Sequence, residues 1–333
     1  MNQYFHLFSC CIPVKGYKKA VVCDLQRNII QPISLPLYEI LVDDNEYNTA
    51  SIEDITLKYG VKEKQLIEEY ITFLYHNQFG YTTDKPLAAI RLNLNDYVES
   101  RSITNAIVDF DPNSTHSLCQ IMPQLNELSC IALELRYYFS VSSKILTGEL
   151  GYTQGSTLNI LEVVVEYSDE YQLEKVMKIK ESFPVLKKIT ISHSQENVVY
   201  KSDDLSVIYT TETIADERCC GVTNELYCIA ETRLFLESVH FNSCLNKKIA
   251  VDKTGQIKNC PSMKRSFGFI GTTKLKDVLK DENFRKIWRI NKDQIEVCSD
   301  CELRYVCQDC RAYLEDNQNI YSKPLKCNYN PYV

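Results

Sequence analysis

The segment IEVCSDCELRYVCQDC (295–310) organises this chain, because it spaces four cysteines as C-x2-C-x5-C-x2-C. Upstream, Cys244 and Cys260 flank Gly255 in the spacing C-x10-G-x4-C, and Cys327 follows sixteen residues after Cys310. A thiolate is a soft ligand, and C-x2-C places two of them on one tight turn, within reach of the same metal or cluster. Seven such ligands exceed the four of one tetrahedral site, so the spacing predicts two sites.

Disulfides, zinc and iron–sulfur clusters all use cysteines at this density. Disulfides persist mainly in oxidising compartments, and nothing in the chain indicates secretion. Structural zinc stays open as an alternative, because paired C-x2-C motifs also form zinc ribbons. Zinc ribbons usually separate their pairs by about fifteen residues or more, whereas five residues separate Cys301 from Cys307. The short separation favours iron–sulfur clusters over zinc.

The whole cysteine pattern resembles the SPASM domain, the auxiliary-cluster module of many peptide-modifying radical-SAM enzymes. The usual module has three residues inside its last pair, where this chain has two. The wider text HFNSCLNKKIAVDKTGQIKNCPSM (240–263), together with SKPLKCNYNPY (322–332), is similar to the SPASM-domain peptide maturases of grasp-with-spasm systems. Those systems pair the maturase with an ATP-grasp ligase and a short precursor peptide, so the resemblance implies both as partners.

The resemblance also implies two auxiliary [4Fe–4S] clusters and their ligands. One cluster would be held by Cys298, Cys301, Cys307 and Cys327. The other would be one ligand short, with Cys244, Cys260 and Cys310. His240 is a candidate for the missing ligand, because imidazole replaces thiolate in some clusters. Other candidates are Cys219, Cys220 and Cys228. An open iron that binds peptide or substrate is the remaining alternative.

The composition is that of an ordinary globular protein, with 333 residues, 44% hydrophobic and 24% charged, and a net charge of −7. This negative charge disfavours nucleic-acid binding, which needs clustered lysine and arginine, and is compatible with a basic peptide partner. The sequence has no run of eighteen apolar residues, so it predicts no membrane span. The first residues lack the basic and small-residue features of a signal peptide. We therefore expect a cytoplasmic protein with reduced thiols.

Residues 1–90 predict a winged-helix-like element. Three strand-like runs come first, at 4–14, 17–25 and 27–33. Three helical stretches follow, at 37–42, 51–60 and 62–80. Ser51 is the expected N-cap of the second helix. This order resembles PqqD-like recognition elements, which bind the leader of a precursor peptide as an added strand beside the last helix. DNA binding is disfavoured by Glu68 and Glu69 in that helix, and a packing domain without a ligand stays open.

Residues 91–218 predict a partial α/β barrel. Five strand-like apolar runs occur, at 105–110, 130–138, 158–167, 186–192 and 205–211. A helical stretch at 169–183 lies between the third and the fourth, and such alternation is typical of a parallel sheet. Radical-SAM barrels carry C-x3-C-x2-C in the loop after the first strand, but here the loop at 111–124 holds Cys119 alone. The triplet occurs nowhere in the chain, so we expect a degenerate barrel. Asp109 and Glu134 are either buried partners or remnants of a substrate site.

The sequence thus predicts a three-part α/β protein, with a recognition element at 1–90, a degenerate partial barrel at 91–218 and an iron–sulfur SPASM module at 219–333. The expected function is a maturation factor for a ribosomally made peptide, which binds the precursor and acts beside the ATP-grasp ligase. Two alternatives stay open: a redox enzyme that modifies the peptide through its clusters, and a zinc-stapled scaffold. Whether the chain is itself catalytic also stays open.

Overall fold

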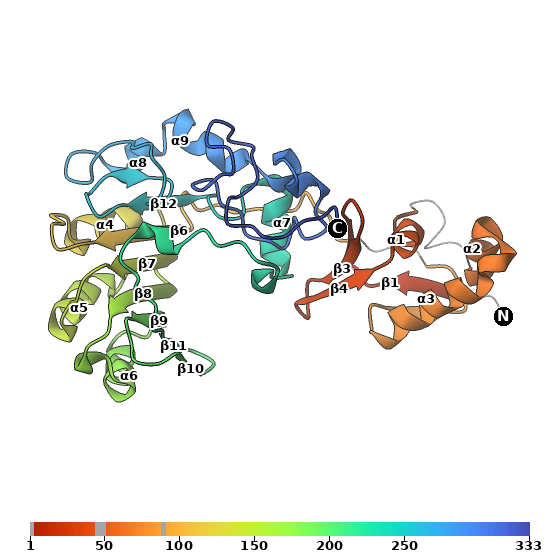
Figure 1. Cartoon of the computed structure of the whole chain (residues 1–333), viewed down its shortest axis with the longest axis horizontal. Coiled ribbons are helices and arrows are strands. Elements are labelled where there is room, and N and C mark those ends of the chain that lie inside the picture. Colours follow the sequence, from red (N-terminus) through yellow and green to blue (C-terminus); the bar gives the residue numbers. More distant parts are fainter. Residues whose placement is uncertain (1–2, 44–50, 88–90) are drawn as a thin grey trace.

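The computed structural model describes residues 3–43, 51–87 and 91–333 of a mixed α/β protein. Figure 1 shows a small N-terminal unit at one end, a large sheet at the other and the cysteine-rich C-terminal region between them. Within the described ranges, none of the helices combines the length and the apolar character needed to cross a membrane.

The N-terminal unit contains a three-stranded and a two-stranded sheet with three helices. Its elements are β1 (Tyr4–Leu7), β2 (Cys11–Lys15), β3 (Ala20–Asp24), β4 (Ile29–Ile33), α1 (Leu35–Val42), α2 (Ile52–Tyr59), α3 (Lys64–His76) and β5 (Gly80–Thr83). The antiparallel sheet has the order β2-β3-β4, and β1 pairs with β5. The predicted N-cap is confirmed: Ser51 begins α2 with a capping box, in which its hydroxyl accepts from the Asp54 N–H and the Asp54 carboxylate accepts from the Ser51 N–H.

Two features of this unit differ from the prediction. The run at 4–14 is two strands, because a turn in which the Cys11 N–H donates to the Phe8 carbonyl at 2.9 Å separates them. The predicted helix at 62–80 ends earlier, at His76, and the chain then forms β5, which the sequence did not predict. The observed order is therefore four strands, three helices and a fifth strand. The expected boundary at residue 90 lies outside the described residues.

The large sheet has eight strands in the order β10-β11-β9-β8-β7-β6-β12-β13. They are β6 (Asn105–Phe110), β7 (Ala132–Tyr137), β8 (Ile160–Glu166), β9 (Leu186–Ser192), β10 (Val198–Lys201), β11 (Ser206–Tyr209), β12 (Lys248–Val251) and β13 (Ile257–Lys258). The six inner strands are parallel, and the edge strands β10 and β13 are antiparallel to their neighbours. The predicted parallel sheet and its five predicted strands are confirmed.

One face of this sheet is apolar and is covered by α4 (Leu118–Glu127), α5 (Ser143–Leu150) and α6 (Leu173–Ser182) (Figure 1). The start of α4 falls within the loop predicted at 111–124, which is therefore shorter than expected. The opposite face carries charged side chains. The buried Asp109 accepts hydrogen bonds from Arg136 at 2.7 and 2.9 Å and from the Tyr138 hydroxyl at 2.9 Å. Asp109 is thus a buried ion-pair partner, the first of the two alternatives that the sequence left open.

The cysteine-rich region shares the large sheet, because β12 pairs in parallel with β6. The sheet therefore extends across the boundary expected at residue 218. The helices of this region are α7 (Thr232–His240), α8 (Leu275–Val278) and α9 (Glu282–Lys286). From residue 287 to the end, the chain folds as loops with short 3-10 turns.

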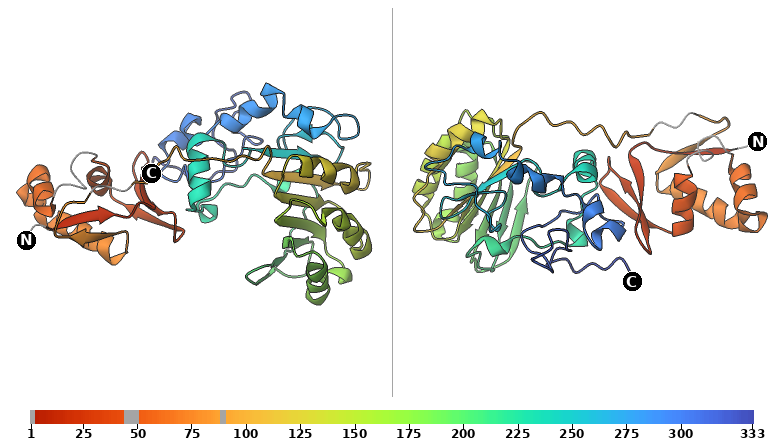
Figure 2. Two further views of the ribbon diagram at one scale, coloured as in Figure 1. Left: turned by 180° about the vertical axis from the view of Figure 1, so that it is seen from behind. Right: turned by 90° about the horizontal axis from the view of Figure 1, so that it is seen from above.

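The N-terminal unit packs directly on this region, as the right-hand view of Figure 2 shows. The turn between β2 and β3 contacts the C-x2-C loop: the Tyr17 N–H donates to the Asp300 carbonyl at 2.7 Å, and Arg304 donates to the Lys15 carbonyl at 2.6 Å. An apolar cluster that includes Val21 and Val306 lies beneath these bonds. The first cysteine loop and the N-terminal unit therefore form one packed interface.

Candidate functional site

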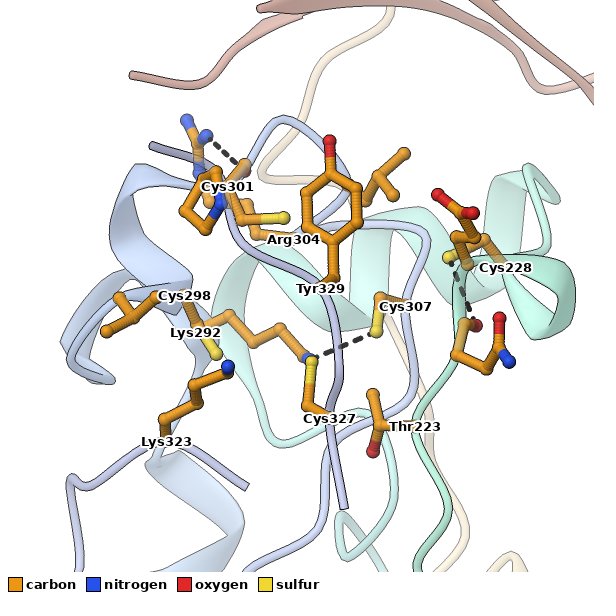
Figure 3. Close-up of a pocket in the computed structure, with 15 residues that line it drawn as sticks. Thr223, Cys228, Lys292, Cys298, Cys301, Arg304, Cys307, Lys323, Cys327 and Tyr329 are labelled. Carbon is orange, nitrogen blue, oxygen red and sulfur yellow. Dashed lines mark hydrogen bonds between the residues drawn. The ribbon is translucent and has the colours of Figure 1, made fainter. Parts of the chain in front are cut away.

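Five cysteines line one small cavity of about 30 Å³ in the C-terminal region (Figure 3). Four are the ligands expected for the first cluster: Cys298, Cys301, Cys307 and Cys327. The fifth, Cys228, comes from the loop before α7. We call these five residues the first thiol group.

Tight local structure positions the thiols of the first group. Cys298 and Cys301 lie on one turn, in which the Cys301 N–H donates to the Cys298 carbonyl at 3.0 Å. Val297 enters this turn with a φ of 66°, a left-handed conformation that non-glycine residues adopt rarely. Cys327 comes back beside Thr223 through a parallel bridge. Residues distant in sequence are therefore held around the same cavity.

A buried lysine lies inside the first group. Lys292 is only 4% exposed, and its ammonium is 3.2 Å from both the Cys307 sulfur and the Gln308 carbonyl oxygen. Figure 3 shows its side chain reaching across to Cys307. A hydrogen bond from the Cys228 thiol and the charge of Lys292 lower the pKa of Cys307 to about 6, against the opposing effect of burial. The site therefore stabilises a thiolate at Cys307, as a metal or cluster ligand requires.

The other three expected ligands also come together, with a fourth thiol. Cys260 and Cys310 are buried, each 8% exposed, and Cys244 is half-buried. The loop that carries Cys220 lies against them, since a Cβ added at Gly221 would be 3.1 Å from the Cys310 sulfur. We call the four cysteines the second thiol group: Cys220, Cys244, Cys260 and Cys310.

The second group also contains a lysine. The Lys248 ammonium lies 3.4 Å from the Cys244 sulfur. Burial alone would lower the pKa of Lys248, but the negative charges of Cys244, Cys260 and Cys220 together raise it. Each thiol group is thus matched by one cation, which would offset part of the negative charge of its thiolates.

His240 is directed elsewhere. Its Nε2 lies 2.7 Å from the Leu94 carbonyl oxygen, in the segment that leads from the N-terminal unit to the large sheet. The sequence placed Cys220 among four candidates for the missing ligand, with His240, Cys219 and Cys228, and did not distinguish between them. Lys248 and Lys292 carried no sequence signal beyond their position inside the cysteine pattern.

The spacing of the thiols can be compared with the spacing that a zinc ion requires. All fifteen cysteines are free thiols. Tetrahedral zinc with Zn–S bonds of about 2.3 Å brings its sulfurs to about 3.8 Å of one another. Within the described ranges, the set with three ligand atoms inside 4.8 Å of one another is Cys10, Cys11 and Asp24, and it contains no thiol of the C-terminal region. Among the described residues, no three C-terminal thiols therefore lie within 4.8 Å of one another, a wider spacing than that of the sulfurs around one tetrahedral zinc ion.

The set at Cys10 and Cys11 has a simpler explanation. Asp24 accepts hydrogen bonds from the N–H groups of Gln26 and Arg27 at 3.0 Å and from the Arg27 side chain at 2.6 Å. Its carboxylate is therefore already satisfied by the turn after β3. Cys11 is buried at the start of β2, and Cys10 before it is half-buried.

Comparisons with known proteins add no assignment to this geometry. No protein-family model matches the chain, and no curated protein matches it.

Proposed function

We propose that this chain is a maturation factor for a ribosomally made peptide, which binds the precursor through its N-terminal unit and carries two iron–sulfur clusters beside an ATP-grasp ligase. The observation that carries the proposal is the convergence of nine thiols, five in the first thiol group and four in the second, each group with a lysine ammonium beside one of its sulfurs. A four-thiolate cluster is anionic, so a cation beside it lowers the cost of burying its charge.

The residues present also define what the clusters would contribute. A four-iron cluster supplies one-electron transfer, and the hydrogen bonds of Lys248 and Lys292 would tune its reduction potential. The C-x3-C-x2-C triplet is absent from the sequence, so these ligands provide no three-thiolate site of the radical-SAM type. The missing triplet favours one of the two roles: an adaptor that positions the peptide, rather than an enzyme that initiates radical chemistry.

The free edge of the small sheet supports the peptide-binding part of the proposal. Among the described strands, β4 pairs with β3 alone, and its Pro32 is of the kind found on edge strands. Both ends of β4 are tied to α3: Arg27 donates to the carbonyls of Asn77 and Gln78 at 3.0 Å, and Ser34 donates to the Tyr70 hydroxyl at 2.8 Å. An extended peptide added to β4 would lie along this helix.

Charge suits a basic peptide at this place. A groove of about 530 Å³ follows α3, and Glu68 and Glu69 line it. Carboxylates along a groove attract lysine and arginine side chains and raise the rate of association at low ionic strength.

Binding of the precursor peptide that the proposal implies tests its recognition part. We expect the full-length Glu68→Lys, Glu69→Lys double variant to bind a fluorescent precursor about tenfold or more weakly. Each substitution removes one attraction for a basic ligand and adds one repulsion. Glu174→Lys is the matched control, because Glu174 is exposed on α6, a helix that covers the large sheet and is not part of the N-terminal unit. Equal affinity of wild type, double variant and control would reject the recognition role.

The cluster part has its own test. The protein is purified without oxygen and assayed for iron, sulfide and zinc, and we expect about eight irons per chain for two four-iron clusters. A colourless protein with stoichiometric zinc would instead support the scaffold alternative.

A further inference from the structure

The second thiol group raises one chemical question, whether its site is closed or keeps an open position. Three motif thiols would leave one iron of a four-iron cluster free to bind a substrate. Four thiolates would close the site, as in structural and electron-transfer centres. Whether the protein supplies a fourth donor therefore decides between an open site that binds substrate and a closed site that does not.

The loop at 217–223 is held between the two thiol groups by hydrogen bonds from Lys326 and Ser262. Lys326 donates to the carbonyls of Arg218 and Cys220, both at 2.7 Å. Ser262, two residues after Cys260, donates to the Glu217 carbonyl at 3.2 Å. The loop is thus bonded to segments next to two cysteines of the pattern, Cys260 and Cys327.

Gly221 makes the closest approach. Its φ of 90° is left-handed, and a Cβ there would lie 2.7 Å from the Tyr313 ring and 3.1 Å from the Cys310 sulfur. Glycine therefore lets the backbone after Cys220 pass directly over Cys310. Cys220 itself is exposed, whereas Cys260 and Cys310 are buried, so Cys220 stands at the open side of the group.

Charge distinguishes Cys220 from its neighbour. The groups that act on Cys220 include the Cys244 thiol and the Lys248 ammonium, both in the second group. The groups that act on Cys219 are led by Arg136, with Glu134 and Asp109, on the polar face of the large sheet. Arg136 and Glu134 act on both thiols, but the motif cysteine Cys244 and the Lys248 ammonium are among the groups that act most strongly on Cys220 and not among those that act most strongly on Cys219.

We propose that Cys220, from outside the seven-cysteine pattern, is the fourth thiolate of the site with Cys244, Cys260 and Cys310, and that this site is closed. The identity of the bound group rests on the proposed function, whereas the choice of ligand does not. A closed site has no free iron for the peptide, so this centre carries electrons or stabilises the fold. The peptide must then be modified at another site, as expected if this chain acts as an adaptor.

Cys220→Ser tests the proposal, with Cys219→Ser as the matched control and Cys244→Ser as the positive control. All are full-length proteins purified without oxygen. We expect Cys220→Ser, like Cys244→Ser, to lose up to half of its iron or to hold it as a three-iron cluster, visible by electron paramagnetic resonance after oxidation. Cys219→Ser should match wild type. Added 2-mercaptoethanol should restore the wild-type spectrum of Cys220→Ser, because it supplies the missing thiolate.

The outcomes separate the two proposals. Iron content and spectra in Cys220→Ser equal to those of wild type would overturn the ligand assignment. If wild type holds zinc, the cluster part of the proposed function fails, and loss of zinc in Cys220→Ser but not in Cys219→Ser would still support the assignment. Urea unfolding of the metal-free proteins serves as the folding check, and we expect equal midpoints because the Cys220 thiol is exposed. Cys220→Ala replaces the serine variant if that variant alone unfolds.

Discussion

Gly16, in the turn between β2 and β3, should govern the docking of the N-terminal unit. A Cβ added there would lie 2.6 Å from the Glu302 Oε2, 2.7 Å from the Glu302 nitrogen and 2.9 Å from the Asp300 oxygen. Two of these atoms belong to the backbone and cannot rotate away. Gly16→Ala must therefore push the turn off the C-x2-C loop.

The structure sets the size of this effect. Displacing the turn breaks the bond from Tyr17 to Asp300 and the charge-assisted bond from Arg304 to Lys15. At about 1 kcal/mol for the neutral bond and about 1.5 to 3 kcal/mol for the charged one, the docked state should lose about 2.5 to 4 kcal/mol. Urea unfolding should show this loss, and hydrogen exchange should accelerate at 15–19 and 299–305.

Gly148→Ala in α5 is the control of opposite sign. An added Cβ there meets no atom within 4 Å, and alanine in a helix is favoured over glycine. We expect this variant to gain about 0.5 to 1 kcal/mol. Equal stability and equal exchange for Gly16→Ala and wild type would refute the docking geometry.

Two further substitutions test the buried charges. Asp109→Asn leaves Arg136, which is 2% exposed, without its counter-charge, so the free energy of unfolding should fall by about 3 to 5 kcal/mol; a thermal midpoint equal to that of wild type would contradict the buried pair. Lys292→Met removes the ammonium 3.2 Å from the Cys307 sulfur, and on the proposed function the reduction potential of the first cluster should fall, because an anionic reduced state loses a donor. A charged hydrogen bond of about 1.5 to 3 kcal/mol corresponds to about 65 to 130 mV for one electron, measurable by redox titration, and an unchanged or raised potential would rule out tuning by this lysine.

The sequence located the central strands well and the edges poorly. The runs at 105–110 and 186–192 match β6 and β9 because both are rich in the β-branched and large apolar residues that strands favour. The short strands β5, β10, β12 and β13 lack that signal. Their pairing depends on neighbours distant in the chain, which a local pattern does not encode.

The site divides in the same way. Cysteine spacing defined seven thiols, since ligands on one turn must be close in sequence. Cys220 and Cys228 joined them through tertiary contacts of the loops before α7, more than a dozen residues from the pattern. The burial of Lys292 depends equally on the fold, because lysine side chains are normally exposed.

Geometry constrains how an adaptor of this kind can work. In the small sheet, β4 is two strands away from β2, whose turn contacts the C-x2-C loop. Strands stand about 4.8 Å apart, so a peptide added at the free edge of β4 would lie about 15 Å from β2. An extended chain covers about 3.3 Å per residue, so at least about five residues after the bound leader are needed to reach the first thiol group. On the proposed function, a peptide with fewer residues than this after its leader would bind to the N-terminal unit but would not reach the clusters. Binding at β4 would therefore select peptides of a minimum length.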